Sequence, residues 1–555
     1  MDSKYKVIKD SVHGYIEIPE VIIDHIIDTP HFQRLNRIEQ TSMRVLYPSA
    51  RHDRFIHSIG TYYLGCKAFR YFKININNEF PELDISPDQW DKWQISFELA
   101  CLLHDVGHSP FSHTLEHLFQ SKKHNIDNER TETYIDFRLK SKMSESLKDK
   151  FKEQFEDYCK TFETDYRGCS PAPHERVSSI VVLECFQSII SELGADIELI
   201  VRSIIGCVYK NPQDHYGIKN CLIRMLNSNL IDVDKLDYIA RDTMLTGFEN
   251  ITIDTERLLR SMTAYKVRTD YYPAYNKNAL SVIQNVITAN NAQQAWIVNH
   301  HVVIYNAHLV KVSINKLAKI MHDNPQKWLE DLFSVDSIIG KVKLEGKINT
   351  EINMLCDDDL WHLLKRYMED IPEVQEMLDR RKRKTALWKS LAEYTTLFDM
   401  EERQGEYSFN IYSSYFSNAC SSATNFSGYL NVSKEDEPNY AADTNLDYDT
   451  CSSLIDEFCK KYQYDSKQFI CLKGGETYKN NAAIARDSIM IKFGNREKNY
   501  KDVMKYYNQT SNASTMGAGS SSYFFLYYNA SDKPINKDEF VDFIKICPEF
   551  RANNT

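Results

Sequence analysis

Glycine is scarce in this chain, which has only 18 glycines among its 555 residues. Because glycine weakens helix interiors, its scarcity favours a helical protein. The chain also lacks a signal-like apolar N-terminus and any apolar run near the roughly 18 residues that a membrane-spanning helix needs. These absences argue against a secreted or membrane-spanning protein, and they predict a globular protein of the cytoplasm with no membrane partner.

The chain lacks an excess of positive charge as well. Its 67 Lys and Arg residues are outnumbered by 78 Asp and Glu residues, which gives a formal net charge of −11. This balance argues against a general nucleic-acid coat protein and leaves nucleic acid only as a local contact. The 13 cysteines include no C-x-x-C pair, so the sequence predicts neither a zinc ribbon nor a disulfide framework.

Apolar residues at three- and four-residue spacing, as in residues 93–103 and 177–193, predict mostly helix over residues 1–330. A strongly polar stretch over about 118–170 indicates an inserted, solvent-exposed helical segment. Residues 331–400 are expected to form a helical connection that carries a basic run. Residues 401–555 are expected to form a small α+β lobe, with strands over 468–472, 488–493 and 523–528, a helix over 537–546 capped by Asn536, and loops around 417–450 and 508–522. The predicted fold is mainly α.

Histidines cluster in the string ELACLLHDVGHSPFSHTLEH, residues 98–117. An apolar helix over 97–103 should end at His104 and Asp105, which places an imidazole and a carboxylate side by side, a pair that suits a divalent metal ion. His108 would share a face with His104 if the helix continued. Gly107 and Ser109-Pro110 are expected to break that helix and start another.

On this second helix His113 and Glu116 are three residues apart, so they can form an acid/base pair. A lone His-Asp pair is usually accidental. A cluster of four histidines with carboxylates at a helix break favours function, because burying so many polar groups for stability alone is costly.

Two further segments add chemistry to this cluster. In RHDRFIHSIG, residues 51–60, Arg54 and His57 are three residues apart, which places an anion-binding guanidinium beside a candidate metal ligand. In IDVDKLDYIARD, residues 231–242, one helical stripe carries Asp234, Tyr238 and Asp242, with Lys235 alongside. Taken alone, that stripe is more typical of a solvated helix face.

Seven segments in this order resemble the HD-domain deoxynucleoside triphosphate (dNTP) triphosphohydrolases, namely the bacterial dGTPases and the catalytic core of the vertebrate antiviral SAM-and-HD-domain proteins. They are KVIKDSVHGYIEI, DTPHFQRLNRIEQ, YPSARHDRFIHSIG, HDVGHSPFSH, PHERVSS, IDVDKLDYIARD and HHVVIYNAHLVKV. The resemblance runs from about residue 6 to residue 316. It implies an HD-domain helical core and hydrolysis of a dNTP to a deoxynucleoside and inorganic tripolyphosphate.

The resemblance also implies roles for single residues. A divalent metal ion (Mn, Mg, Fe or Zn) would be held by His57, His104, Asp105 and Asp234. Catalytic and proton-handling roles fall to His108, His113, Glu116 and His174. The dNTP substrate would be bound by Gln40, Arg54, Lys235, Tyr238, Asp242, Tyr305 and Asn306. A nucleotide effector would be bound by Lys6, Asp28 and Gln33.

The sequence departs from the vertebrate pattern at several of these positions. Thr41 replaces a leucine that follows the sugar-reading glutamine, and Asn306 replaces a glutamine on the base side. In the regulatory site Asn36 replaces an arginine and Lys9 an asparagine. The preferred base and the effector are therefore left open.

The basic run 380–384 has three readings: a solvated face, an effector-phosphate contact between subunits, or a nucleic-acid contact. The resemblance further implies a homo-oligomer (a dimer, tetramer or hexamer) and an antiviral or antiphage role through dNTP depletion. Two alternatives stay open. One is an HD-superfamily phosphodiesterase or nuclease, and the other is a non-catalytic nucleotide-sensing scaffold.

Overall fold

The computed structural model describes residues 4–126, 131–151, 155–212, 215–248, 252–398, 456–465, 469–474, 488–494, 496–508, 523–529 and 534–546. The chain forms two compact units, neither of which is continuous in sequence. The first takes its described residues from 1–291, 318–362 and 480–513, and the second from 292–317, 363–479 and 514–555. The predicted domain boundaries near residues 330 and 400 stay a prediction.

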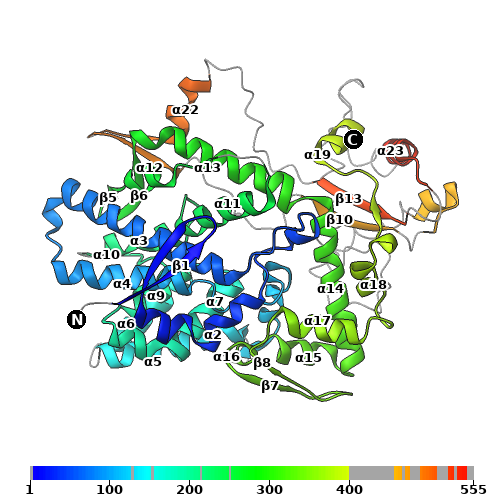
Figure 1. Ribbon diagram of the computed structural model, residues 1–555, viewed down its shortest axis with the longest axis horizontal. Helices are drawn as coiled ribbons and strands as arrows, with labels where there is room; N and C mark the ends of the chain where they lie inside the picture. The colour runs from blue at the N-terminus through cyan, green and yellow to red at the C-terminus, as the bar shows by residue number, and fades with distance from the viewer. Residues whose placement is uncertain are drawn as a thin grey trace. The chain divides into compact units, whose positions relative to one another are not determined.

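Helices dominate the described residues (Figure 1). They are α1 (Glu20–Ile22), α2 (Pro30–Gln33), α3 (Arg54–Glu79), α4 (Pro87–Leu103), α5 (Tyr134–Phe151), α6 (Phe155–Tyr166), α7 (Pro173–Val181), α8 (Gln187–Glu192), α9 (Ile197–Ile204), α10 (Tyr216–Leu226), α11 (Val233–Thr246), α12 (Thr255–Arg260), α13 (Leu280–Gln293), α14 (His301–Met321), α15 (Pro325–Leu332), α16 (Val335–Ile339), α17 (Asp357–Arg366), α18 (Pro372–Leu378), α19 (Leu391–Phe398), α22 (Tyr500–Asn508) and α23 (Lys537–Ile546). This confirms the predicted mainly α fold. None of the described helices has both the length and the apolar character needed to span a membrane.

Small sheets complete the fold. Their strands are β1 (Tyr5–Asp10), β2 (Gly14–Pro19), β3 (Lys123–Asn125), β4 (Thr131–Thr133), β5 (Met262–Val267), β6 (Asp270–Asn276), β7 (Lys341–Leu344), β8 (Thr350–Asn353), β9 (Thr385–Ala386), β10 (Ile470–Gly474), β11 (Met490–Phe493), β12 (Arg496–Asn499) and β13 (Tyr523–Tyr528). A three-stranded sheet has the order β10-β13-β9, and a four-stranded sheet has the order β12-β11-β6-β5. Strand β11, predicted as part of the C-terminal lobe, runs parallel to β6 and so lies in the first unit.

Three helices of the first unit carry the candidate site, and polar caps set where each begins. Asp53 caps α3 by accepting a hydrogen bond from the backbone N–H of Ile56 (3.1 Å). Ser86 caps α4, and Asp232 caps α11. Helices α3 and α4 pack side by side through aromatic side chains, with the ring centroids of Phe69 and Phe97 6.1 Å apart. Because α4 ends at Leu103, His104 and Asp105 emerge directly from a buried helix, as predicted.

The polar segment before α7 is not a solvent-exposed excursion, so that prediction is wrong. It is helical, as expected, but α5 buries one apolar face through Ile135, Leu139 and Met143. Polar side chains of α5 also pair with the core, since Asp136 accepts two hydrogen bonds from Arg176 (2.9 and 3.0 Å). The polar composition concealed an apolar stripe at helical spacing.

The second unit has an aromatic core of its own that includes Trp388, Phe458, Phe524 and Phe540. The indole N–H of Trp388 donates to the carbonyl of Phe524 (2.6 Å). Helix α23 has the predicted bounds, and the side chain of Asn536 accepts from the N–H of Asp538 (3.0 Å). The small α+β lobe is thereby confirmed in class. The loops predicted around 417–450 and 508–522 lie outside the described residues, apart from Asn508.

Candidate metal and phosphohydrolase site

Four predicted metal ligands meet where α3, the end of α4 and α11 converge. The Nε2 atoms of His57 and His104 are 3.2 Å apart. Asp234 Oδ1 lies 3.0 Å from the Nε2 of His57 and 3.6 Å from that of His104. Asp105 Oδ2 lies 3.7 and 3.5 Å from the same two nitrogens. Donor atoms of His57, His104 and Asp105 all lie within 4.8 Å of one another, and Asp234 adds a carboxylate oxygen beside the two imidazole nitrogens.

The opposite ring nitrogens explain why this donor set fits a cation. His57 Nδ1 lies 2.7 Å from Asp237 Oδ2, and His104 Nδ1 lies 2.9 Å from the carbonyl oxygen of Cys101. Both oxygens can only accept, so each Nδ1 is assigned the proton and each Nε2 keeps its lone pair. Two lone pairs and two carboxylates that face one another require a positive charge between them. A divalent metal ion with mixed nitrogen and oxygen ligands meets that requirement.

Protons compete with a metal ion for the side chains of this site. Burial alone lowers the pKa of His57, but hydrogen bonds with Asp234 and Asp237 raise it to about 9. Burial alone raises the pKa of Asp105, but Arg54 and the neighbouring histidines hold it well below its usual range. In the absence of metal the carboxylates thus stay ionised and a histidine carries the compensating proton.

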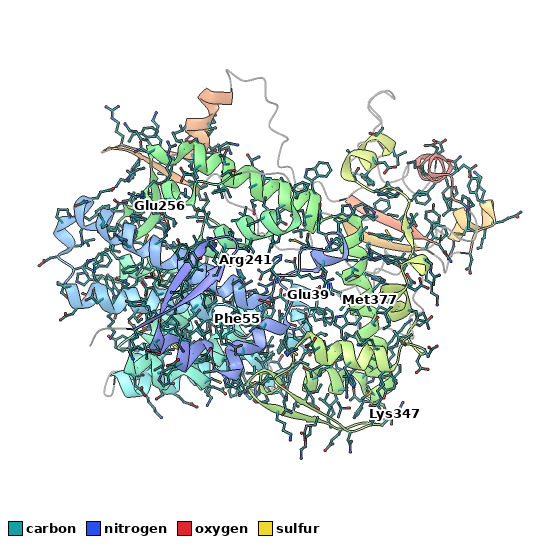
Figure 2. All side chains as sticks on the ribbon, in the orientation of Figure 1. Glu39, Phe55, Arg241, Glu256, Lys347 and Met377 are labelled. Atoms are coloured by element: carbon teal, nitrogen blue, oxygen red, sulfur yellow. The ribbon has the colours of Figure 1, made fainter. Side chains whose placement is uncertain are left out.

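A glycine on α3 lets the side chains that support His57 approach it closely. Gly60 follows it by one turn on α3, and a Cβ at this position would lie 2.0 Å from Asp237 Oδ1 and 2.4 Å from Arg241 Nη2. The missing side chain lets the Asp237–Arg241 pair reach the back of the histidine. Arg241 is fully buried, with two hydrogen bonds to Asp237 (2.8 and 2.9 Å) and one to Asp10 (2.8 Å). Figure 2 labels Arg241 among the side chains.

A second cluster contains the predicted catalytic residues His108, His113, Glu116 and His174. Glu116 bridges two of the histidines, with Oε2 2.6 Å from His174 Nδ1 and Oε1 3.2 Å from His113 Nδ1. The ring of His108 stacks on that of His174 at 4.5 Å between centroids, and its own Nε2 is buried without a partner. All four side chains are close enough to share a single ion or to pass a proton.

The charges within this second cluster are unequal. Burial lowers the pKa of His174, but Glu116 more than compensates and raises it to about 9. Burial also lowers the pKa of His113, which stays below its usual value despite Glu116. The two histidines hold the pKa of Glu116 well below its usual range, against the effect of burial. At neutral pH His174 is the protonated member and His113 the neutral one.

The backbone between the clusters differs from the prediction. No helix restarts at Ser109-Pro110, because two short 3₁₀ turns follow instead, η5 (Ser112–Thr114) and η6 (Glu116–Gln120). Gly107 makes this loop possible, since a Cβ there would lie 2.3 Å from the backbone nitrogen of Ser178. Sequence spacing could not reveal this approach of α7 to the loop.

Several predicted substrate residues already have protein partners. Arg54 donates to Asp105 Oδ2 (2.7 Å), Ser112 Oγ (3.0 Å) and the carbonyl of Gln40 (3.0 Å). Lys235 donates to Asp232 Oδ2 (2.6 Å) and the carbonyl of Ser228 (2.7 Å). These bonds use three of the five N–H groups of Arg54 and two of the three of Lys235, so both keep capacity for an anion.

The predicted sugar-binding residues also lie in the first unit. Asp242 Oδ1 is 2.5 Å from His52 Nε2. The side-chain oxygen of Gln40 is buried without a hydrogen-bond partner, and so is the hydroxyl of Thr41. Tyr238 lies on α11, one turn after Asp234. Unpartnered buried oxygens of this kind are satisfied by a polar ligand or by water.

The remaining predicted binding residues, for the substrate and for an effector, lie elsewhere in the chain. Tyr305 and Asn306 lie on α14 in the second unit, where the hydroxyl of Tyr305 donates to Glu376 (2.6 Å). Their substrate role stays a prediction. Of the predicted effector residues, Lys6 lies 2.5 Å from Asp24 and 3.9 Å from Asp28, and Gln33 donates to the carbonyl of Ile27 (2.8 Å).

Sequence reasoning missed the support of the metal cluster. Asp237, Arg241, His13 and Asp10 form one buried network behind His57, with His13 Nε2 2.6 Å from Asp237 Oδ1. The i, i+4 spacing of Asp237 and Arg241 was visible but is equally typical of a surface ion pair. Only the fold shows that their side chains are buried.

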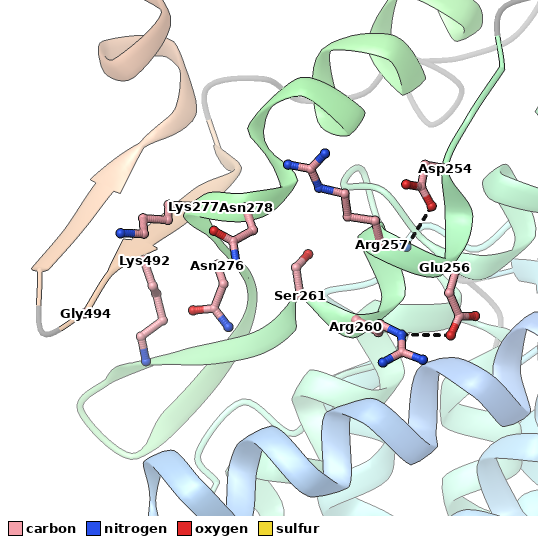
Figure 3. Close-up of a pocket in the computed structure, with 10 residues that line it drawn as sticks. All are labelled: Asp254, Glu256, Arg257, Arg260, Ser261, Asn276, Lys277, Asn278, Lys492 and Gly494. Carbon is pink, nitrogen blue, oxygen red and sulfur yellow. Dashed lines mark hydrogen bonds and ion pairs between the residues drawn. The ribbon is translucent and has the colours of Figure 1, made fainter.

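The first unit also contains a cavity of about 560 Å³. It is lined by α12, the turn after β6 and strand β11 (Figure 3). Its charged side chains are Arg257, Arg260, Lys277, Lys492, Asp254 and Glu256. Arg260 is paired with Glu256 (2.9 Å), and the backbone of Arg257 donates to Asp254 (3.0 Å). Lys492 is paired with Glu79, so Arg257 and Lys277 against Asp254 are the charges that incline the cavity toward an anion.

Comparison of the sequence with those of known proteins gives several similar proteins. The chain is 40% identical over 266 residues to the deoxynucleoside triphosphate triphosphohydrolase SAMHD1 of Danio rerio, a match that covers 47% of this chain and 37% of that protein. The match shows similarity to proteins named dNTP triphosphohydrolases over about half of this chain. The chain is also 24% identical over 375 residues to the HD domain-containing protein L394 of Acanthamoeba polyphaga mimivirus, covering 66% of this chain and 65% of that protein.

The chain is also 27% identical over 356 residues to the uncharacterised protein YwfO of Bacillus subtilis, a match that covers 64% of this chain and 65% of that protein. The chain spans less than two thirds of the length of each of these curated relatives. No protein-family model matches it.

Proposed function

We propose that this protein is a metal-dependent dNTP triphosphohydrolase that converts a dNTP and water to a deoxynucleoside and tripolyphosphate. The observation that carries the proposal is the pairing of two clusters. His57, His104 and Asp105 group three donor atoms, Asp234 lies beside the two histidines, and the HD loop leads from them directly to the group of His113, Glu116 and His174. The likeness to proteins named dNTP triphosphohydrolases supports the same reaction.

The residues divide the work as follows. A divalent ion held by His57, His104, Asp105 and Asp234 would supply Lewis-acid charge and a water of lowered pKa. Arg54 and Lys235 hold the triphosphate through the N–H groups that protein partners leave over, and they stabilise negative charge as it develops at the α-phosphorus.

Proton transfer falls to the second cluster. His174 carries the proton that the leaving 5′-oxygen needs, and the neutral His113, held by Glu116, relays that proton to the oxygen. Gln40 and Asp242 contact the sugar, where the unpartnered oxygen of Gln40 receives a hydroxyl donor.

The test is a product analysis. Protein stripped of metal and reloaded with Mn²⁺ is incubated with each dNTP singly and with all four mixed, with and without GTP or ATP, and the products are separated by anion exchange. Tripolyphosphate with deoxynucleoside is expected. Release of monophosphates from a cyclic or polymeric substrate would favour the phosphodiesterase or nuclease alternative. Nucleotide binding without turnover under any divalent metal would favour the scaffold.

Matched variants localise the chemistry. Glu116→Gln removes the charge that orients His113, so turnover should fall at least 100-fold while Mn²⁺ binding is retained. Glu82→Gln, at an exposed position in η4 (Pro81–Leu83), is the control and should leave turnover unchanged. Equal turnover in the two variants would contradict the assignment of Glu116.

Regulation by a nucleotide forms a second part of the proposal. The basic cavity beside α12 supports an anionic effector, whereas the family resemblance favours the surface around Lys6, Asp28 and Gln33. Lys277→Ala and Lys6→Ala separate the two sites, with the exposed Lys327→Ala as control. The half-maximal concentration of an activating nucleotide should rise for one of the first two variants only. Light scattering with and without nucleotide tests for a homo-oligomer, and infection of cells that express the protein tests the antiviral role.

A further inference from the structure

The loops that carry the candidate site contain little regular structure. Residues 38–41 carry Gln40 and contact the start of α3, where the N–H of Arg54 donates to the carbonyl of Ile38 (3.0 Å), and residues 104–112 carry the HD motif. In the second loop Phe111 and Ser112 have φ of 54° and 49°, a left-handed conformation that ordinary side chains disfavour. Contacts from outside must hold both loops in place.

One buried carboxylate joins them. Asp357 is the first residue of α17, and its two oxygens accept from two different loops: Oδ1 from the N–H of Phe111 (2.7 Å) and Oδ2 from the N–H of Glu39 (2.9 Å). The ring of Phe111 also packs edge-on against Trp361 of α17, with 5.6 Å between centroids. Burial raises the pKa of Asp357 to about 7, while the two N–H groups oppose that rise.

Hydrogen bonds link the two loops to residues of the proposed substrate site. Ser112 Oγ donates to the carbonyl of Glu39 (2.5 Å) and accepts from Arg54 Nε (3.0 Å). Arg54 then donates to the carbonyl of Gln40 and to Asp105. A continuous series of hydrogen bonds therefore runs from Asp357 to two residues of the proposed substrate site.

We propose that Asp357 is a positioning residue that holds Gln40 and Arg54 in the geometry that the substrate requires. The inference rests on the proposed function, because its kinetic consequence is a loss of dNTP hydrolysis. Two acceptor oxygens are needed at this position, since each oxygen of Asp357 accepts a hydrogen bond from a different loop. An asparagine offers one oxygen and one NH₂ group, which would face a backbone N–H and push one loop away.

Its two neighbours on α17 provide matched controls. Asp358 is exposed and pairs with Arg37 on the surface (2.6 Å). Asp359 accepts from the N–H of Cys356 (2.9 Å), so it supports the start of the helix without touching either loop. Asp359→Asn therefore reports on the loosening of the helix alone, and Asp358→Asn on the loss of one surface charge.

The experiment compares the three asparagine variants with the wild type, all loaded with Mn²⁺. Asp357→Asn should lower kcat/KM for dNTP hydrolysis about 10- to 100-fold, because displacements of about 1 Å have effects of that size. Its affinity for Mn²⁺ should change less than threefold, and the two controls should keep kcat/KM within threefold of the wild type. Equal losses in Asp357→Asn and Asp359→Asn would overturn the proposal, since helix stability would then explain both.

Hydrogen exchange tests the positioning without relying on activity. The amides of Glu39 and Phe111 should exchange at least tenfold faster in Asp357→Asn than in Asp359→Asn. Unchanged exchange at both amides would overturn the proposal. If the wild type hydrolyses no dNTP, the proposed function fails, whereas the exchange rates still decide whether Asp357 holds the loops.

Discussion

Replacing Asp237 with asparagine tests how the metal cluster is built. This carboxylate is fully buried and accepts from His57, from His13 and twice from Arg241. Asparagine keeps one acceptor oxygen, so the bonds cannot all be made, and Arg241 loses one of its two buried carboxylate partners and keeps Asp10. Breaking a buried ion pair in this way costs about 3–5 kcal/mol, and loss of the hydrogen bond behind a metal-binding histidine lowers metal affinity about 10- to 100-fold.

Two assays measure these effects separately. Urea unfolding of the metal-free protein gives the change in the free energy of unfolding, and calorimetric titration with Mn²⁺ gives the affinity. Asp91→Asn, which alters a surface pair with Lys73, is the control and should change both quantities little.

A second substitution separates stability from metal binding. Adding Arg241→Met to Asp237→Asn also removes the cation that pairs with the buried Asp10, which then keeps only the hydrogen bonds from the backbone of Val12 and His13. The double variant should lose further stability, because Asp10 is left buried without its cation, but no further Mn²⁺ affinity. Mn²⁺ affinity within twofold of the wild type in the single variant would refute the reasoning, because His57 would then be oriented without Asp237.

Three further outcomes are expected. The pKa of His57 is raised to about 9, so its proton stabilises the metal-free fold fully below about pH 6.5 and that stabilisation is lost as the pH rises through 9. Urea unfolding across this range should show the decline, and apparent Mn²⁺ affinity should rise over the same range as protons stop competing. His174, with a pKa raised to about 9, should give turnover an alkaline limb near that pH, and Glu116→Gln should move the limb to lower pH in a profile of kcat/KM. Gly107→Ala should lower the thermal midpoint and abolish turnover, because its Cβ would meet the backbone of α7; wild-type behaviour would contradict the close approach.

Much of this architecture could be predicted from local pattern. The end of α4 at Leu103, the strand at Tyr523–Tyr528 and the helix at Lys537–Ile546 follow from apolar periodicity and capping residues. The grouping of His57, His104, Asp105 and Asp234 came from family resemblance, since these ligands are far apart in sequence. What periodicity missed are long-range contacts that leave no local signal.

Asp357 is the clearest such case. In the sequence it is one of three consecutive aspartates and looks like an ordinary helix N-terminus. Its partners, Glu39 and Phe111, are 318 and 246 residues away. The same applies to β11, whose pairing with β6 joins residues more than 200 positions apart.

That pairing has a consequence for how the chain is synthesised. Strand β6 is complete once Asn276 has been made, but β11 emerges from the ribosome only after Met490. Until then the β6 edge has unpaired backbone N–H and C=O groups, which are prone to pair with other chains. The unit that carries the candidate site therefore cannot finish folding before nearly the whole protein has been translated. A chain cut short at residue 479 should aggregate, even though every predicted metal ligand precedes the cut.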